Sequence, residues 1–265
     1  MYNFQYHRPA TIDEAKKILS GNEEAKLLGG GMTLLPTMKL RLAQPSDLVD
    51  LGGIESLFGI KQDGDVIEIG ALTPHADVAA SAVVRAEIPA LAQLVGLIGD
   101  AQVRNRGTIG GSLSNSDPSA DYPAAVLGLN GVIQTDEREI AADEYFKGLF
   151  ETALQPREIL QAVRFPKPAR AAYAKFPNPA SRYAIVGVMV VETADGIRVA
   201  VTGAGPCVFR STVIEQALAN DFAPAALDDL TIDAEDFNAD MHASAEYRAH
   251  LVVVMAKRAV VAASG

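Results

Sequence analysis

Two glycine-rich segments about eighty residues apart constrain this chain more than any other feature of its sequence. The first is Leu28-Gly29-Gly30-Gly31-Met32-Thr33, and the second is Thr108-Ile109-Gly110-Gly111-Ser112. Glycine lets a backbone reach positive φ and approach a ligand that a Cβ would keep away. Successive amide groups can then converge on an anion. Two such segments could hold the two phosphates of a dinucleotide from opposite sides, whereas the alternative for each one alone is a tight turn.

The composition of the chain excludes several classes of protein. With 265 residues, 49% of them hydrophobic, the chain can bury a substantial core and form two domains. Its net charge of −10 and lack of a basic run argue against a nucleic-acid binder. No apolar stretch approaches the roughly 18 residues that a membrane span needs. The N-terminus shows no signal-peptide pattern, so the predicted location is the cytoplasm.

The single cysteine, Cys207, limits the cofactors that this chain can hold. One thiol forms no internal disulfide and cannot ligate an iron–sulfur cluster, which usually takes four cysteines. Any such cluster must therefore lie on another chain.

The first fifty residues predict a small βαβ-like unit. A capped helix starts at Thr11 and ends at Gly21, and short strands are expected at residues 25–28 and 48–51. Residues 33–42 look helical, with an irregular start caused by Pro36. The first glycine segment thus follows the carboxyl end of a strand, where ligands of open α/β sheets usually bind.

The rest of the chain predicts an α+β region followed by a second domain. Asp63-Gly64 and Asp195-Gly196 each mark a hairpin, and prolines between residues 166 and 179 suggest a domain boundary. Further elements are expected as helices at 73–83, 89–98, 122–129 and 243–263, a third hairpin at 132–141, and a strand at 159–165.

Other candidate sites have simpler explanations. Gly203-Ala204-Gly205 follows a strand, but Pro206 removes an amide donor and Val208 stands where a dinucleotide motif needs glycine, which favours a structural turn. No two acidic residues stand out as a general acid and base. The histidines lack the spacing of a helical zinc pair and are expected at the surface or in the core: His7, His75, His242 and His250.

Asp117 and Asp121 follow the second glycine segment and are expected to differ in role. A carboxylate beside bound phosphates would be repelled, but it accepts hydrogen bonds from the hydroxyls of a polyol such as the ribityl chain of a flavin. We expect Asp117 to cap the turn before Pro118. For Asp121 we favour contact with a ligand over the alternative, an N-cap of the helix that starts at Tyr122.

Four segments together resemble the FAD-binding (medium) subunits of molybdenum hydroxylases, in particular those of aerobic carbon monoxide dehydrogenases and the xanthine dehydrogenase family. They are residues 28–42, 99–111, 117–124 and 240–248. The resemblance covers essentially the whole chain. It implies an α+β fold with an FAD-binding domain of the vanillyl-alcohol-oxidase type at residues 1–176, built of subdomains at about 1–52 and 53–176. A C-terminal domain with a small antiparallel sheet and helices would follow at 177–265.

The resemblance also implies a set of FAD contacts. The first segment would wrap the pyrophosphate, the second would hold it from the other side, Asp121 would bind ribityl or ribose hydroxyls, and Tyr183 would cover the isoalloxazine ring. The sequence departs from the family pattern at several of these positions, including Gly29, Met32, Ser112 and Asn115. The implied contacts are Leu27, Leu28, Gly29, Gly30, Gly31, Met32, Thr33, Leu34, Thr108, Gly110, Gly111, Ser112, Asp121, Leu160, Lys175 and Tyr183.

The function implied by the resemblance is electron transfer within a larger oxidoreductase. A large subunit would hold molybdopterin, a small subunit would hold two [2Fe–2S] clusters, and FAD on this chain would pass electrons to an external acceptor. The expected assembly is a heterohexamer of two heterotrimers. One alternative is a stand-alone FAD-dependent oxidase or reductase of the same fold, and another is a non-catalytic nucleotide-binding module.

Overall fold

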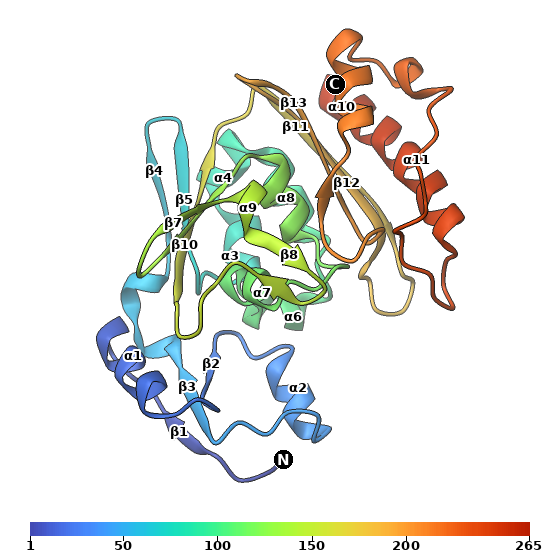
Figure 1. The fold of residues 1–265 in the computed structure, drawn as a ribbon. Helices are drawn as coiled ribbons and strands as arrows, with labels where there is room; N and C mark the ends of the chain where they lie inside the picture. Colours follow the sequence, from blue (N-terminus) through green and yellow to red (C-terminus); the bar gives the residue numbers. More distant parts are fainter.

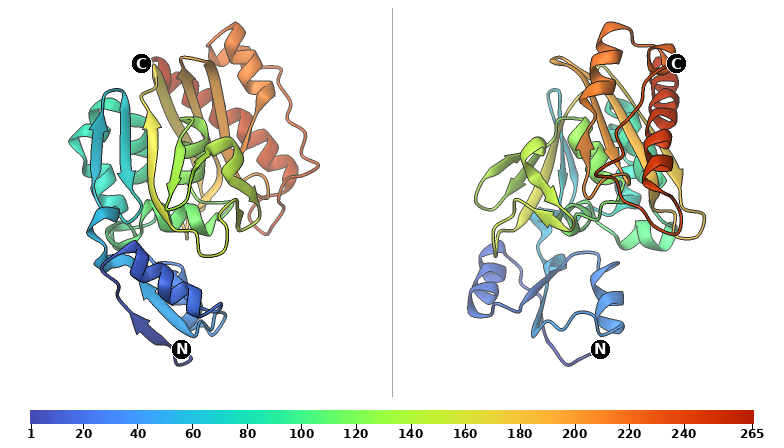
Figure 2. Two further views of the ribbon diagram at one scale, coloured as in Figure 1. Left: turned by 60° about the vertical axis from the view of Figure 1, so that its left-hand side comes forward. Right: turned by 45° about the vertical axis from the view of Figure 1, so that its right-hand side comes forward.

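The computed structural model describes residues 1–265, which form a small N-terminal unit, a central body and a C-terminal layer (Figure 1). Figure 2 shows that the N-terminal unit projects from one end of the body, with the C-terminal helices at the other end. No helix in the chain is both long enough and apolar enough to span a lipid bilayer.

The N-terminal unit is a three-stranded parallel sheet with two helices. Its strand order is β1-β3-β2, and it confirms the predicted βαβ arrangement with β2 parallel to β3. The edge strand β1 was not expected. The elements are β1 (Gln5–His7), α1 (Ile12–Gly21), β2 (Lys26–Leu28), α2 (Leu34–Lys39), β3 (Asp47–Asp50), and the 3-10 turns η1 (Leu51–Gly53) and η2 (Glu55–Leu57).

Both helices of this unit have clear local causes. The Thr11 hydroxyl accepts from the amide of Glu14, and Glu14 in turn accepts from the amide of Ala10, which closes a capping arrangement at the start of α1. The second helix is shorter than the expected residues 33–42. It ends at Lys39 because Arg41 takes a left-handed conformation with φ of 62°.

The central body is a five-stranded antiparallel sheet covered by helices. Its strand order is β4-β5-β10-β6-β7. Neighbouring strands pair antiparallel, which agrees with the mainly antiparallel sheet expected from the sequence. The strands are β4 (Ile60–Asp63), β5 (Val66–Gly70), β6 (Val132–Thr135), β7 (Glu139–Ala141) and β10 (Leu160–Pro166); the helices are α3 (His75–Ala80), α4 (Ala82–Glu87), α5 (Pro89–Gly96), α6 (Ala101–Arg106), α7 (Ile109–Asn115), α8 (Tyr122–Gly128) and α9 (Ala142–Tyr145); β8 (Phe146–Gly148) and β9 (Glu151–Thr152) form a separate hairpin.

Two helices of the body differ from the sequence prediction. The single helix expected at residues 73–83 is divided into α3 and α4 at Ser81, whose ψ of 124° is not helical and whose hydroxyl accepts from the amide of Val84. The second glycine segment is also helical itself, because α7 begins at Ile109 with Thr108 as its N-cap. A serine or threonine hydroxyl can replace the missing backbone acceptor at a helix start, so either residue can begin a helix in mid-sequence.

The C-terminal layer is a four-stranded antiparallel sheet with helices on both faces. Helix α11 covers one face of the sheet, and α5 and α8 of the body lie against the other (Figure 1). The elements are β11 (Arg170–Pro177), β12 (Ala184–Thr193), β13 (Gly196–Thr202), β14 (Phe209–Arg210), α10 (Thr212–Asn220), η3 (Pro224–Leu227) and α11 (Ala245–Ser264).

Strand β12 joins the two hydrophobic cores because side chains alternate across a sheet. Met189 and Val191 belong to the core of the central body, whereas Val188 and Val190 belong to the core beneath α11. A strand buried on both faces needs a continuous apolar run, which the sequence of β12 provides. The C-terminal layer is therefore packed into the body rather than tethered to it.

Strand β11 bears on the position of the domain boundary. It pairs with β12 from Arg170 to Pro177, so its hydrogen bonds place it in the C-terminal sheet. The strand thus begins ahead of the boundary expected at residue 177, and its pairing favours a boundary just before Arg170.

Replacing Met189 by alanine should destabilise the whole chain. The side chain is fully buried and fills the space beside Gly128 of α8, where an added Cβ would come within 2.9 Å of its Cγ. We expect the free energy of unfolding in urea to fall by about 2–5 kcal/mol, the usual cost of truncating a buried methionine. The half-exposed Val213 of α10 is the control, and Val213→Ala should change stability by less than about 0.5 kcal/mol. Equal effects of the two changes would contradict the double-core role of β12.

Candidate functional site

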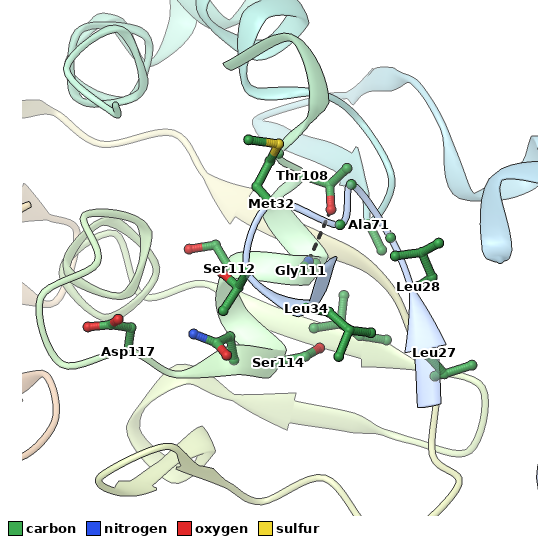
Figure 3. Close-up of a pocket in the computed structure, with 18 of the residues that line it drawn as sticks. Leu27, Leu28, Met32, Leu34, Ala71, Thr108, Gly111, Ser112, Ser114 and Asp117 are labelled. Carbon is green, nitrogen blue, oxygen red and sulfur yellow. Dashed lines mark hydrogen bonds between the residues drawn. The ribbon is translucent and has the colours of Figure 1, made fainter. Parts of the chain in front are cut away.

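A cavity of about 780 Å³ lies where the N-terminal unit meets the body (Figure 3). Its volume is within the roughly 300–1,000 Å³ that is usual for small-molecule and cofactor sites. Both glycine segments contribute to its wall, together with the acidic segment 117–121 and the turn before β12. Of the sixteen FAD contacts predicted from sequence, all except Lys175 line this cavity.

The first glycine segment leaves β2 and passes over residues 106–108, where the second one begins. A Cβ on Gly30 would lie 1.8 Å from the carbonyl oxygen of Arg106 and 2.9 Å from the Cα of Gly107. Gly31 has a φ of 75°, which side-chain-bearing residues rarely adopt. The two glycines therefore meet different needs, because Gly30 allows close packing of the two segments and Gly31 allows the turn.

The two segments differ in how many of their amide N–H groups remain free to donate to a ligand. The amides of residues 29–33 donate to no acceptor within the protein. In the second segment, Gly110 donates to the Ala71 carbonyl at 2.8 Å, Gly111 to the Thr108 hydroxyl at 3.1 Å, and Ser112 to the Thr108 carbonyl at 3.0 Å. All five amides of residues 29–33 are thus free for a ligand, whereas Gly110, Gly111 and Ser112 of the second segment are bonded within the protein.

Asp121 lines the cavity, but it is buried and its carboxylate is paired within the protein. Its carboxylate accepts from the Tyr173 hydroxyl at 2.5 Å and from the Lys175 ammonium at 2.8 Å. Burial raises the pKa of Asp121, and the charge and hydrogen bonds of these two partners oppose that rise. The aspartate occupies the N-cap position of α8 but makes no capping hydrogen bond, so the capping alternative is not supported.

Lys175 lies behind the cavity wall. Its side chain is 3% exposed, and its ammonium also donates to the carbonyl of Leu97 at 3.3 Å. The structure therefore places this lysine next to Asp121, one layer away from the cavity, where its charge compensates that of the carboxylate.

Asp117 combines the predicted turn with a place on the cavity wall (Figure 3). One carboxylate oxygen accepts from the amide of Ser119 at 2.9 Å, which is the expected cap of the turn. Burial raises its pKa. Sequence reasoning assigned this residue to the turn alone.

Tyr183 stands at the mouth of the cavity with 45% of its surface exposed. It follows Arg182, which has a φ of 62° and donates to the carbonyl of Gly99 at 3.3 Å. Its own carbonyl accepts from the amide of Asn178. These contacts hold the turn between β11 and β12 at the cavity. Leu160, at the start of β10, is buried in the opposite wall.

His75 supports the second glycine segment from below. A Cβ on Gly107 would come within 2.6 Å of its Nε2, and its ring packs against Tyr122 at a centroid distance of 5.2 Å. Burial, and then the charge of Arg104, lower the pKa of His75 to about 4. The imidazole is therefore neutral at pH 7, as its place in an apolar wall requires.

Glu158 forms the most highly connected polar group of the wall. Arg138 binds both of its oxygens, at 2.9 and 3.0 Å, and the Thr135 hydroxyl and the Gln155 amide each donate to it. The bidentate Arg138 contact is the main reason why the pKa of Glu158 falls to about 2, with burial opposing it. Sequence reasoning missed this residue because Arg138 and Glu158 are twenty positions apart and neither belongs to a recognisable motif.

Two family models together match almost the entire chain. The FAD-binding domain of molybdopterin dehydrogenases matches residues 2–168, and the C-terminal domain of carbon monoxide dehydrogenase flavoproteins matches residues 171–263. The chain belongs to the FAD-binding subunits of the molybdenum hydroxylases. The resemblance found in the sequence is thereby confirmed, as is the α+β fold that it implied.

Individual relatives are similar to this chain over nearly their full length. The carbon monoxide dehydrogenase medium chain of Hydrogenophaga pseudoflava is 35% identical, and the match covers 98% of this chain and 96% of the relative. The nicotine 6-hydroxylase medium subunit of Paenarthrobacter nicotinovorans is also 35% identical, with the same shares covered. The solved structure of the Hydrogenophaga enzyme superposes with a TM-score of 0.91 and covers 99% of this chain and 98% of its counterpart.

The residues of the cavity fit an FAD molecule. The unpaired amides of residues 29–33 are donors suited to a pyrophosphate. A Cβ on Gly111 would meet nothing except the Thr108 hydroxyl, at 3.0 Å, so this glycine leaves space on the cavity side of α7. No basic side chain is needed to neutralise the phosphates where such donors converge.

Substitution of Gly30 and Gly111 should separate packing from ligand approach. Gly30→Ala should lower both thermal stability and FAD content, because its Cβ cannot fit against Arg106 without moving the segments apart. Gly111→Val should lower FAD content while leaving the circular dichroism of the protein unchanged, because its branched side chain enters the cavity. Gly96→Ala, where no atom lies within 4 Å, is the control and should change neither. Full flavin occupancy in a well-folded Gly111→Val protein would show that α7 does not border the cofactor.

The Glu158 network predicts a pH-dependent contribution to stability. Since the folded-state pKa lies below the ordinary value of 4.5, this stabilisation is fully present above about pH 5 and is lost as the pH falls toward 2. Glu158→Gln should lower the free energy of unfolding by about 2–3 kcal/mol at pH 7, and the difference from wild type should shrink at pH 3. The exposed Glu139, paired with Arg164, provides the control Glu139→Gln, for which urea titrations should show almost no change. A pH-independent difference for Glu158→Gln would contradict the assignment.

Proposed function

We propose that this chain is the electron-transfer subunit of a three-subunit molybdenum hydroxylase and that its cavity binds one FAD without a covalent bond. The observation that carries the proposal is the row of unpaired amides at residues 29–33, placed on one wall of a cavity of cofactor size. Neither glycine segment contains a cysteine or histidine to which a flavin could be attached.

The partners follow from the division of cofactors. Relatives of this chain are named medium chains or medium subunits, which implies a larger and a smaller subunit beside them. With Cys207 as its only cysteine, this chain cannot ligate an iron–sulfur cluster. A molybdopterin large subunit and an iron–sulfur small subunit would therefore complete the enzyme, in a heterohexamer of two heterotrimers located in the cytoplasm.

The residues of this chain bind and shield the cofactor rather than transform a substrate. Bound flavin supplies the redox chemistry, taking electrons from the clusters and passing them to an acceptor outside the complex. The first glycine segment holds the phosphates, and Leu160 and the apolar wall exclude water. Tyr183 covers the mouth of the cavity, and the buried Lys175 donates a hydrogen bond to the Asp121 carboxylate close to it. The carboxylates of the wall already have protein partners, because Asp121 accepts from Tyr173 and Lys175, Glu158 from Arg138, and Asp117 from the Ser119 amide.

The rival reading is a stand-alone flavin oxidase of the same fold. Such an enzyme needs a substrate pocket next to the flavin, whereas both faces of the C-terminal sheet pack into hydrophobic cores. The electron-transfer role is therefore the better supported of the two.

Expression with and without the neighbouring subunits tests the proposal. The complex should carry one FAD per copy of this chain, released completely by acid precipitation, together with molybdenum and iron. The chain alone should bind FAD incompletely and oxidise no organic substrate. If the isolated chain turns over a substrate with oxygen or NAD as fast as the complex does, the stand-alone oxidase is the correct reading. Flavin that stays with the acid precipitate would instead contradict the non-covalent attachment.

A further inference from the structure

The acidic segment 117–121 of the cavity wall is held almost entirely by the C-terminal layer. The Thr202 hydroxyl lies 2.8 Å from the Pro118 carbonyl and 2.7 Å from the Ala120 carbonyl, so it can donate to either. The amide of Gly203 donates to Pro118 at 2.7 Å, and the amide of Ala184 donates to Ser119 at 3.2 Å. The end of β13 and the start of β12 therefore grip the backbone of this segment.

Strand β11 holds the side chain at the end of the same segment. Tyr173 and Lys175 both point at Asp121, and both come from this strand. All three neighbouring strands of the C-terminal sheet thus contact a segment that belongs to the central body.

Arg248 of α11 ties the gripping strand ends together. Arg248 is buried, with 3% of its surface exposed. One terminal nitrogen of its guanidinium donates to the Ile185 carbonyl at 2.7 Å and to the Gly203 carbonyl at 2.9 Å. Its other terminal nitrogen donates to Asp240 at 2.7 Å. Ile185 and Gly203 each adjoin a residue that holds the acidic segment, and Tyr183 lies two residues before Ile185.

We propose that Arg248 is a positioning residue for the flavin site, acting through β12 and β13 to set the geometry of segment 117–121 and of Tyr183. The proposal rests on the proposed function, in that the cavity holds the flavin. Arg248 itself touches neither the cavity nor the cofactor. Its role depends on the planar fork of the guanidinium, which reaches two carbonyls and a carboxylate at once, a geometry that the single ammonium of lysine does not reproduce. Helix α11 does not line the cavity, but through Arg248 it would influence the geometry of the cofactor site.

Arg198 supplies a matched control. It also is a buried arginine of the C-terminal layer that crosses to the body, where it donates to the Leu127 carbonyl at 3.1 and 2.8 Å and to Asp143 at 2.8 Å. Its partners lie at the C-terminal end of α8 and in α9, and neither of them lines the cavity. Loss of Arg198 should therefore weaken the joint between the two layers without altering the flavin site.

The test compares Arg248→Lys with Arg198→Lys in the coexpressed complex. Three quantities are measured: the melting temperature, the Kd for FAD added back to flavin-depleted complex, and the visible circular dichroism of bound flavin. Both changes should lower the melting temperature. Only Arg248→Lys should raise the Kd, by about tenfold, the equivalent of one hydrogen bond to a charged group, and change the flavin dichroism.

Thr202→Val provides a second variant that leaves all buried charges in place. It removes the hydroxyl that grips Pro118 and Ala120 while keeping nearly the same volume, and should raise the Kd and alter the dichroism in the same direction. If Arg248→Lys fails to fold, the Kd and the flavin dichroism of Thr202→Val serve as the test of the proposal. Wild-type flavin binding and dichroism in Thr202→Val, or an equal loss of flavin in Arg198→Lys, would overturn the proposal. A wild-type complex without FAD would instead defeat the proposed function.

Discussion

The close contact between the first glycine segment and residues 106–107, which lead into the second, determines the site in this chain. Gly30 packs so tightly against the carbonyl of Arg106 that no side chain fits between them. This contact brings the N-terminal unit against the body, and the cavity lies along the line where they meet. The same approach leaves the amides of residues 29–33 without a partner in the protein, whereas Gly110, Gly111 and Ser112 of the second segment donate to protein acceptors. Close packing and ligand binding are thus two results of one backbone arrangement.

The C-terminal layer extends this arrangement from the other side. Because β12 is buried on both faces, its side chains belong to two cores at once, and the layer cannot shift without disturbing the body. The strand ends that leave this rigid sheet hold the acidic segment of the cavity wall, and Tyr183 lies in the turn that enters it. The C-terminal layer therefore helps to shape the cavity that lies between the N-terminal unit and the body.

Charge within the site is balanced by burial and pairing. The chain carries a net charge of −10, and carboxylates lie in the wall of a cavity suited to an anionic cofactor. Asp121 is neutralised by Lys175, and Glu158 by Arg138, each through short hydrogen bonds inside the protein. The repulsion that these groups would exert on phosphates is thereby reduced, and the donors facing the cavity are backbone amides. This arrangement agrees with a protein that holds and tunes a flavin instead of acting on a substrate.

The sequence by itself determined the parallel and antiparallel parts of the fold, the family, and fifteen of the 37 residues that line the cavity. It could do so because glycine spacing, strand periodicity and turn residues act locally along the chain. It did not reveal that Thr108 starts a helix, that Ser81 divides another, or that Lys175 lies behind Asp121 instead of on the wall. Nor did it reveal Glu158, or the grip of Thr202 and Arg248 on the acidic segment. These features join residues tens of positions apart, and hydrogen bonds between distant segments exist only once packing has brought their strands and helices together.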